Sequence, residues 1–80
     1  MTVTVIAFGI VKELFGGSSI TMDIDSGDSV EQLRTRLEHR YPRLKAIASY
    51  LIAVNNEYAT PEELIKATDE IAVIPPVSGG

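Results

Sequence analysis

The chain has no cysteine among its 80 residues, which excludes a disulfide framework, a thiolate nucleophile and a cysteine-ligated metal centre. Long apolar runs are missing too. The longest, residues 5–11, is interrupted by Gly9 and is far too short to span a membrane. The first eight residues carry no basic segment and read at once as a strand, so we expect no secretion signal and a cytoplasmic location.

Positive charge is also scarce, because seven Lys and Arg residues stand against eleven Asp and Glu residues, for a net charge of −4. Nucleic-acid binding needs clustered cations that replace counterions, so this balance argues against it. The single histidine, His39, is expected on the solvent side of a helix, and the acidic pairs lack the spacing of a calcium loop. We therefore predict no metal site and no catalytic histidine.

Hydrophobic periodicity predicts one small domain, residues 1–75, of the α+β class. The expected strands cover residues 2–8, 19–25, 50–54, 58–59 and 71–75, and a helical turn is expected at 10–15. This order predicts a mixed sheet of four to five strands with one main helix across one face. Because one helix covers only one face of a sheet, Phe8, Tyr58 and Ile74 are expected on the open face. Such a patch is typical of a partner surface; the alternative is that loops cover it.

The main helix is predicted at residues 29–41, where apolar side chains recur with helical spacing. Asp28 is expected to cap its first turn, with Glu31 three residues later as in a capping box. A second, shorter helix is predicted at residues 60–66, because a threonine followed by a proline is typical of an N-cap and a first helical position.

The end of the chain is distinctive, and it reads Pro75, Pro76, Val77, Ser78, Gly79 and Gly80. Two prolines cannot donate hydrogen bonds to a sheet, so residues 76–80 are expected to form a flexible tail. Six extended residues reach roughly 20 Å. A glycine at the last position leaves its carboxylate open to activation by ATP and to attack by sulfur or an amine. A Gly-Gly alone is weak evidence, because a frayed end has the same composition.

Three segments resemble the small subunit of molybdopterin synthase, a sulfur carrier with the ubiquitin-like β-grasp fold. They are residues 69–80, with an acidic pair, a strand, Pro-Pro-Val and Gly-Gly; residues 12–16, Lys-Glu-Leu-Phe-Gly; and residues 53–55, Ala-Val-Asn. The resemblance covers nearly the whole chain and is most specific in the tail. Lys12 departs from the family pattern, in which arginine is common, and so lacks the guanidinium fork.

The resemblance implies that an E1-like adenylyltransferase uses ATP to adenylate Gly80 and that a sulfur donor protein converts it to a thiocarboxylate. The tail, Pro75 to Gly79, would then enter the large subunit of a heterotetramer and deliver sulfur to cyclic pyranopterin monophosphate. Phe8, Tyr58 and Ile74 would contact that subunit. The carrier itself would bind no cofactor and would not be an enzyme alone, since the catalytic site would belong to the large subunit.

Two alternatives stay open. The chain could carry sulfur for thiamine or cysteine synthesis, although thiamine carriers tend to be shorter and lack the Pro-Pro-Val approach to Gly-Gly. It could also be a ubiquitin-like modifier that is joined to lysines through Gly80.

Overall fold

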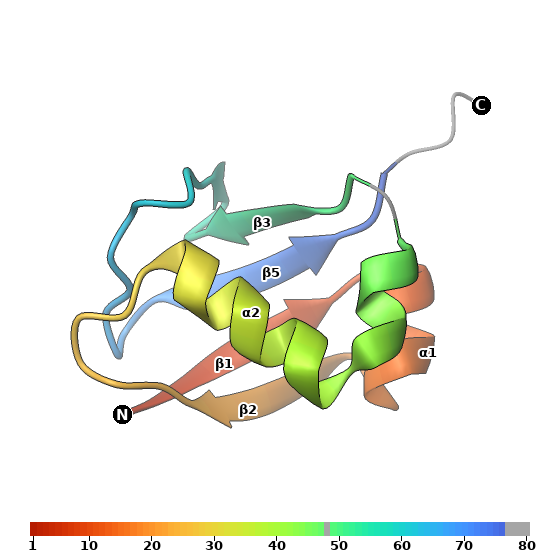
Figure 1. The fold of residues 1–80 in the computed structure, drawn as a ribbon, viewed down its shortest axis with the longest axis horizontal. Coiled ribbons are helices and arrows are strands. Elements are labelled where there is room, and N and C mark those ends of the chain that lie inside the picture. Colours follow the sequence, from red (N-terminus) through yellow and green to blue (C-terminus); the bar gives the residue numbers. More distant parts are fainter. Residues whose placement is uncertain (48, 77–80) are drawn as a thin grey trace.

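Five strands form a single mixed sheet, and one long helix crosses one of its faces (Figure 1). The computed structural model describes residues 1–47 and 49–76. The elements in chain order are β1 (Thr2–Ala7), α1 (Ile10–Phe15), β2 (Ser19–Asp23), α2 (Val30–Arg40), the 3₁₀ helix η1 (Pro42–Ala46), β3 (Leu51–Val54), β4 (Glu57–Tyr58) and β5 (Glu70–Ile74). The sheet order is β2-β1-β5-β3-β4. This confirms the predicted α+β class and its β-grasp arrangement.

The two central strands, β1 and β5, run parallel, and all other neighbours are antiparallel. Val3, Val5 and Ala7 of β1 point toward α2 and are buried, as the alternation of the sequence predicts. In β5, Ile71 and Val73 do the same. The apolar stripe of α2 packs on this face of the sheet, and its buried residues are Val30, Leu33 and Leu37.

Strand ends differ slightly from the prediction. β1 ends one residue earlier, β2 ends at Asp23 rather than at residue 25, and β3 begins at Leu51 rather than at residue 50. The last strand covers 70–74 instead of 71–75. α1 has the predicted bounds, and Gly16 ends it in the left-handed conformation, with φ of 78°. None of the helices in the described part of the chain is long and apolar enough to cross a membrane.

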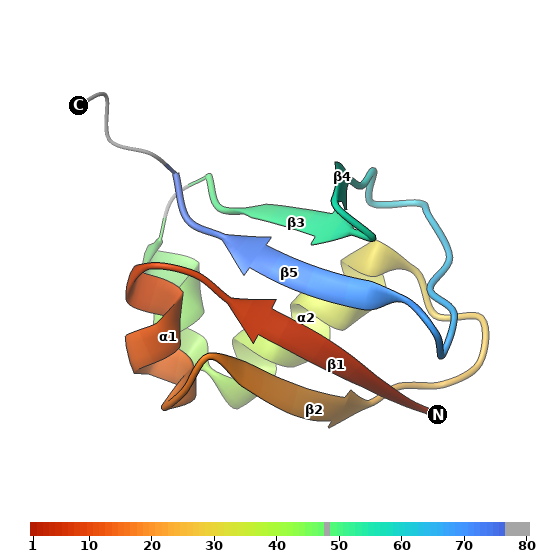
Figure 2. The ribbon, with the colours of Figure 1, turned by 180° about the vertical axis from the view of Figure 1, so that it is seen from behind.

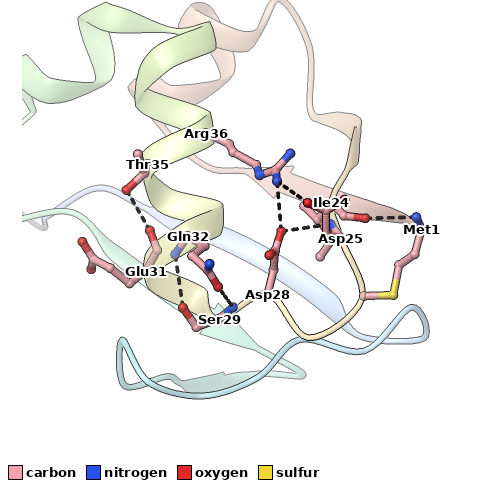
Figure 3. Close-up of polar contacts among 9 residues, drawn as sticks. All are labelled: Met1, Ile24, Asp25, Asp28, Ser29, Glu31, Gln32, Thr35 and Arg36. Atoms are coloured by element: carbon pink, nitrogen blue, oxygen red, sulfur yellow. Dashed lines mark hydrogen bonds and ion pairs between the residues drawn. The ribbon is translucent and has the colours of Figure 1, made fainter.

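The N-cap of α2 is Ser29, so the prediction of Asp28 with Glu31 is wrong by one residue. The Ser29 hydroxyl accepts a hydrogen bond from the Gln32 N–H (3.3 Å), and the Gln32 side chain accepts one from the Ser29 N–H (2.7 Å; Figure 3). Asp28 is instead buried, where its carboxylate accepts the Asp25 N–H at 2.9 Å. Asp28 with Glu31 and Ser29 with Gln32 both have the spacing of a capping box. The Asp28 side chain is bound to the preceding loop, so the Ser29 pair caps the helix.

The helix predicted at residues 60–66 does not form. This segment is a loop that lies beside the start of α2 at one end of the molecule (Figures 1 and 2). The Val30 N–H donates to the Glu63 carbonyl (2.8 Å), and the Glu31 N–H donates to the Pro61 carbonyl (3.0 Å). The first N–H groups of a helix have no partner within the helix. The loop backbone supplies these partners, which outweighs the local preference for helix.

Candidate functional site: the open face of the sheet

The sheet face opposite α2 contains a shallow depression of about 260 Å³. We call this surface the open face. Its lining comes from β1, from the β3–β4 hairpin and from β5, and consists of Ile6, Phe8, Ala53, Asn56, Tyr58, Glu70, Ala72 and Ile74. Strand alternation explains the set, because each strand that buries one row of side chains under α2 must present the other row here. In Figure 2 this face is turned toward the reader.

The structure brings Phe8, Tyr58 and Ile74 together on the open face, as the sequence predicts. Phe8 remains 45% exposed and Tyr58 67% exposed, so loops do not cover these side chains. Ile74 is half-buried at the end of β5. The alternative expectation, that the patch is hidden within the monomer, is therefore wrong. Whether a partner contacts these three residues stays a prediction.

The floor of the depression is made of small residues. Ala53 in β3 pairs with Ala72 in β5 and also with Tyr58 in β4. Two alanines side by side leave a hollow between the larger side chains of Phe8, Tyr58 and Ile74. Ala72 shares the face of Ile74 by strand alternation, but the position of Ala53 in the depression depends on the pairing register of β3 with β5.

A polar network holds the rim of the open face beside the β3–β4 turn. Asn55 adopts a left-handed conformation (φ 53°), and its side-chain oxygen accepts the Glu70 N–H at 3.0 Å. Its side-chain N–H donates to Asp69 at 2.9 Å. The backbone N–H of Lys66 donates to the other Asp69 oxygen at 2.8 Å. The hydrogen bond from the Lys66 N–H, and then that from Asn55, hold the pKa of Asp69 below its ordinary value.

Two residues of this rim, Asn56 and Glu70, were not predicted from the sequence.

The predicted tail begins directly beside the open face. Pro75 follows Ile74, is half-buried and lies against Gly9, where an added β carbon would be 3.0 Å from its Cγ. Gly9 also has a positive φ of 56°, which a residue with a side chain adopts only with strain. Pro76 is exposed. Val77, Ser78, Gly79 and Gly80 lie outside the described residues, so the division into a domain and a tail stays a prediction.

The side chains of the open face suit contact rather than catalysis. They are mainly apolar, and Tyr58, Asn56 and Glu70 supply polar groups at the edge. Within residues 1–47 and 49–76, no group of His, Asp and Glu residues is arranged to hold a metal ion. On the helix side, burial and then a hydrogen bond to Glu38 raise the pKa of Tyr50, far from the open face. The open face is therefore an exposed, mainly apolar surface next to the end of β5.

Comparison with known proteins agrees with this geometry. The ThiS family matches residues 5–80. The chain belongs to the ThiS family. Its relatives include the molybdopterin synthase sulfur carrier subunits of Dictyostelium discoideum, 41% identical over 95% of this chain and 93% of the relative, and of Arabidopsis thaliana, 33% identical over 98% and 82%. The resemblance that the sequence carries is thereby confirmed.

Solved structures place the same fold in two settings. The small archaeal modifier protein 1 of Methanosarcina acetivorans is 30% identical and covers 99% of this ThiS-family chain and 96% of its own, with a TM-score of 0.81. The second is a complex of subunits 1 and 2 of the molybdopterin-converting factor of Helicobacter pylori. There the matching chain is 25% identical, with full coverage of both chains and a TM-score of 0.72.

Proposed function

We propose that this chain is the sulfur carrier subunit of molybdopterin synthase and that the carboxylate of Gly80 is its reactive group. The proposal is supported by the ThiS family match, which runs to residue 80, and by the sulfur carrier subunits among the relatives. The complex of two subunits in Helicobacter pylori supports a large-subunit partner for this chain as well.

The proposed chemistry uses two displacements at Gly80. The carboxylate oxygen attacks the α-phosphorus of ATP on an E1-like enzyme, and pyrophosphate leaves. Hydrosulfide supplied by a donor protein then attacks the carbonyl carbon of the acyl adenylate, and AMP leaves. The resulting thiocarboxylate is a nucleophile at neutral pH. Its sulfur bonds to cyclic pyranopterin monophosphate in the large subunit, and water then cleaves the bond between that sulfur and the Gly80 carbonyl carbon, which returns the carboxylate. Gly80 suits both attacks because no side chain crowds its carbonyl carbon.

One observation supports this role above the others: the open face ends where the tail begins. Ile74 lines the depression, and Pro75 is the next residue. A partner that docks on Phe8, Tyr58 and Ile74 would therefore receive the tail beside its own surface. Pro75, the last residue before the proposed tail, lies against Gly9. Residues 76–79 would then extend into the partner.

Intact mass spectrometry tests the proposed chemistry. The protein is incubated with ATP, an activating enzyme and a sulfur source, and its mass should rise by the difference between one sulfur and one oxygen. A variant that lacks Gly80 should stay unmodified while its thermal midpoint matches that of the full chain, because the buried core cluster lies within residues 3–73. Unmodified full-length protein with an enzyme that loads a known carrier would contradict the proposal, as would a large loss of stability in the truncated variant.

The likeness to a small archaeal modifier protein favours a second candidate, in which Gly80 is joined to lysine side chains of other proteins. The same activation would precede it, but an amine would displace AMP. The same mass experiment separates the two, because conjugation yields much larger species. A carrier for thiamine or cysteine synthesis would give the same thiocarboxylate, and transfer to cyclic pyranopterin monophosphate with the large subunit present distinguishes it.

A further inference from the structure

The cations of this acidic protein are unevenly distributed. α1 and η1 contact each other and lie at one end of the molecule in both views (Figures 1 and 2). This end carries Lys12 on α1, Arg40 at the last position of α2, and Arg43 and Lys45 on η1. The segment from β4 to the start of β5, residues 57–70, lies at the opposite end and carries five acidic residues and a single lysine. The molecule therefore has a basic end and an acidic end.

The cations at the basic end are available for a partner. Two other arginines have acidic neighbours: Arg34 lies 3.7 Å from Glu38, and Arg36 lies 3.0 Å from Asp25. Within the described residues, neither Arg40 nor Arg43 has a carboxylate within ion-pair distance. In a chain with more acids than bases, cations that form no ion pair at one end give that end a local positive potential.

A groove of about 160 Å³ runs between these cations. We call it the basic groove, and its lining residues are Glu13, Leu14, Arg40, Tyr41, Pro42 and Arg43. Leu14, Tyr41 and Pro42 give it an apolar part, and the two arginines line it as well. Glu13, on the α1 side, is the one acidic residue in the lining.

The groove is preorganised by contacts that hold its main side chains. The Tyr41 ring packs against Phe15, with ring centroids 4.7 Å apart. The Arg40 guanidinium lies 5.3 Å from the centroid of the Tyr41 ring and donates to the Thr21 carbonyl at 3.2 Å. Cation–π contacts favour such stacking. Arg40 thus has a defined position with donors left for another acceptor, since a guanidinium has five N–H groups.

We propose that the basic groove docks an acidic segment of a protein partner, with an apolar side chain of that segment on Leu14 and Tyr41 and its carboxylates on Arg40 and Arg43. The combination of apolar side chains and two guanidinium groups in one lining favours a peptide, because arginine binds carboxylates in bidentate geometry. A nucleic acid would require a larger field of cations than this acidic chain offers.

The basic groove and the open face can be occupied at the same time. The groove is lined by α1 and the junction of α2 with η1, whereas the open face lies on the other side of the sheet. Both are tied to the base of the tail, since Gly9, which precedes α1, contacts Pro75. A partner that binds both the basic groove and the open face would therefore contact the chain on two sides of the base of the proposed tail. This docking does not depend on the sulfur chemistry proposed above.

A titration of the isotope-labelled protein with synthetic peptides tests the proposal without any partner enzyme. The probe is a short peptide with one leucine flanked on each side by aspartate and glutamate, and the comparison peptide carries asparagine and glutamine instead. We expect amide NMR shifts confined to residues 13, 14, 40, 41 and 43 with the acidic peptide, weakening as salt is raised. Shifts that are absent, scattered, or centred on Phe8 and Ile74 would overturn the proposal.

Two variants with the same change in charge sharpen the test. Arg43→Gln should weaken binding of the acidic peptide about three- to fivefold, the effect of one exposed ion pair. Lys66→Gln, at the acidic end, should leave the affinity unchanged. Equal weakening by both would show that only net charge matters and would overturn the site. Loading of Gly80 with sulfur is measured separately, so a failure of the groove and a failure of the carrier function give different results.

Discussion

The two faces of the sheet come from the same strands and yet differ in how far their side chains are buried. In β1, Val5 has no exposed surface under α2, whereas its neighbour Ile6 is only half-buried on the open face. In β5, Val73 and Ile74 make the same contrast. An 80-residue chain has one helix long enough to cover one face, so the second apolar row is left for contacts outside the domain. The difference separates residues that stabilise the fold from residues that are free to serve recognition.

The strongest test of this contrast is a cavity on the covered face. Leu37 has no exposed surface and belongs to the core cluster between α2 and the sheet. Leu37→Ala should lower the free energy of unfolding by about 2–5 kcal/mol, because it removes buried methyl groups and leaves a cavity. Urea denaturation followed by circular dichroism measures the loss. In a small domain this is a large part of the total stability.

The matched control is Ile74→Ala on the open face. Ile74 is half-buried, so it has less apolar surface to lose. We expect a loss clearly smaller than that of Leu37→Ala. If the two variants lost the same stability, the open face would be as important for folding as the covered one, and the division proposed here would be wrong.

A substitution on the open face should change the affinity for a partner rather than the stability of the fold. Phe8 is exposed beside the tail, and Phe8→Asp should weaken binding of the molybdopterin synthase large subunit by about 30-fold, or ~2 kcal/mol, the loss typical of an aromatic anchor. Calorimetric titration measures it, and the thermal midpoint should change little. Leu64→Asp makes a similar change at an exposed apolar residue outside the open face and should bind normally. Unchanged affinity of Phe8→Asp would exclude the open face as the interface.

Much of this contrast is predictable from the sequence, because it rests on strand alternation. The period of two assigns Val3 and Val5 to one face and Ile6 and Phe8 to the other without knowledge of the sheet order. Likewise, the helical spacing of Val30, Leu33 and Leu37 predicts the face that α2 buries. Phe8, Tyr58 and Ile74 were therefore placed correctly.

The features that were missed depend on contacts between distant segments. Residues 60–66 have local helix signals, but their carbonyl groups accept hydrogen bonds from the first turn of α2. Asn56 and Glu70 reach the rim of the open face through the pairing of the β3–β4 hairpin with β5. The basic groove joins α1 with the end of α2 and the start of η1. No local sequence pattern predicts these contacts, because they form between segments that only the tertiary structure brings together.

The rim of the open face should differ from the covered face in its response to pH. The pKa of Asp69 is lowered by the Lys66 N–H and then by Asn55. Because the folded value lies below the unfolded one, Asp69 stabilises the fold above its unfolded pKa, and this contribution is lost as the pH falls toward the folded pKa. Asp69→Asn should therefore lower the thermal midpoint modestly at neutral pH, with a difference from the wild type that shrinks in acid.

Thermal unfolding of both proteins across this acidic range measures the difference, and other carboxylates cancel because both chains share them. Asn55→Gly removes one of the two partners of Asp69 and keeps the left-handed turn available. In that background the Asp69→Asn effect should be smaller, because only the Lys66 N–H still favours the charged form. A difference that stays constant as the pH falls would show that the carboxylate of Asp69 does not stabilise the rim through its charge. The rim would then be held, like the covered face, by contacts that do not titrate.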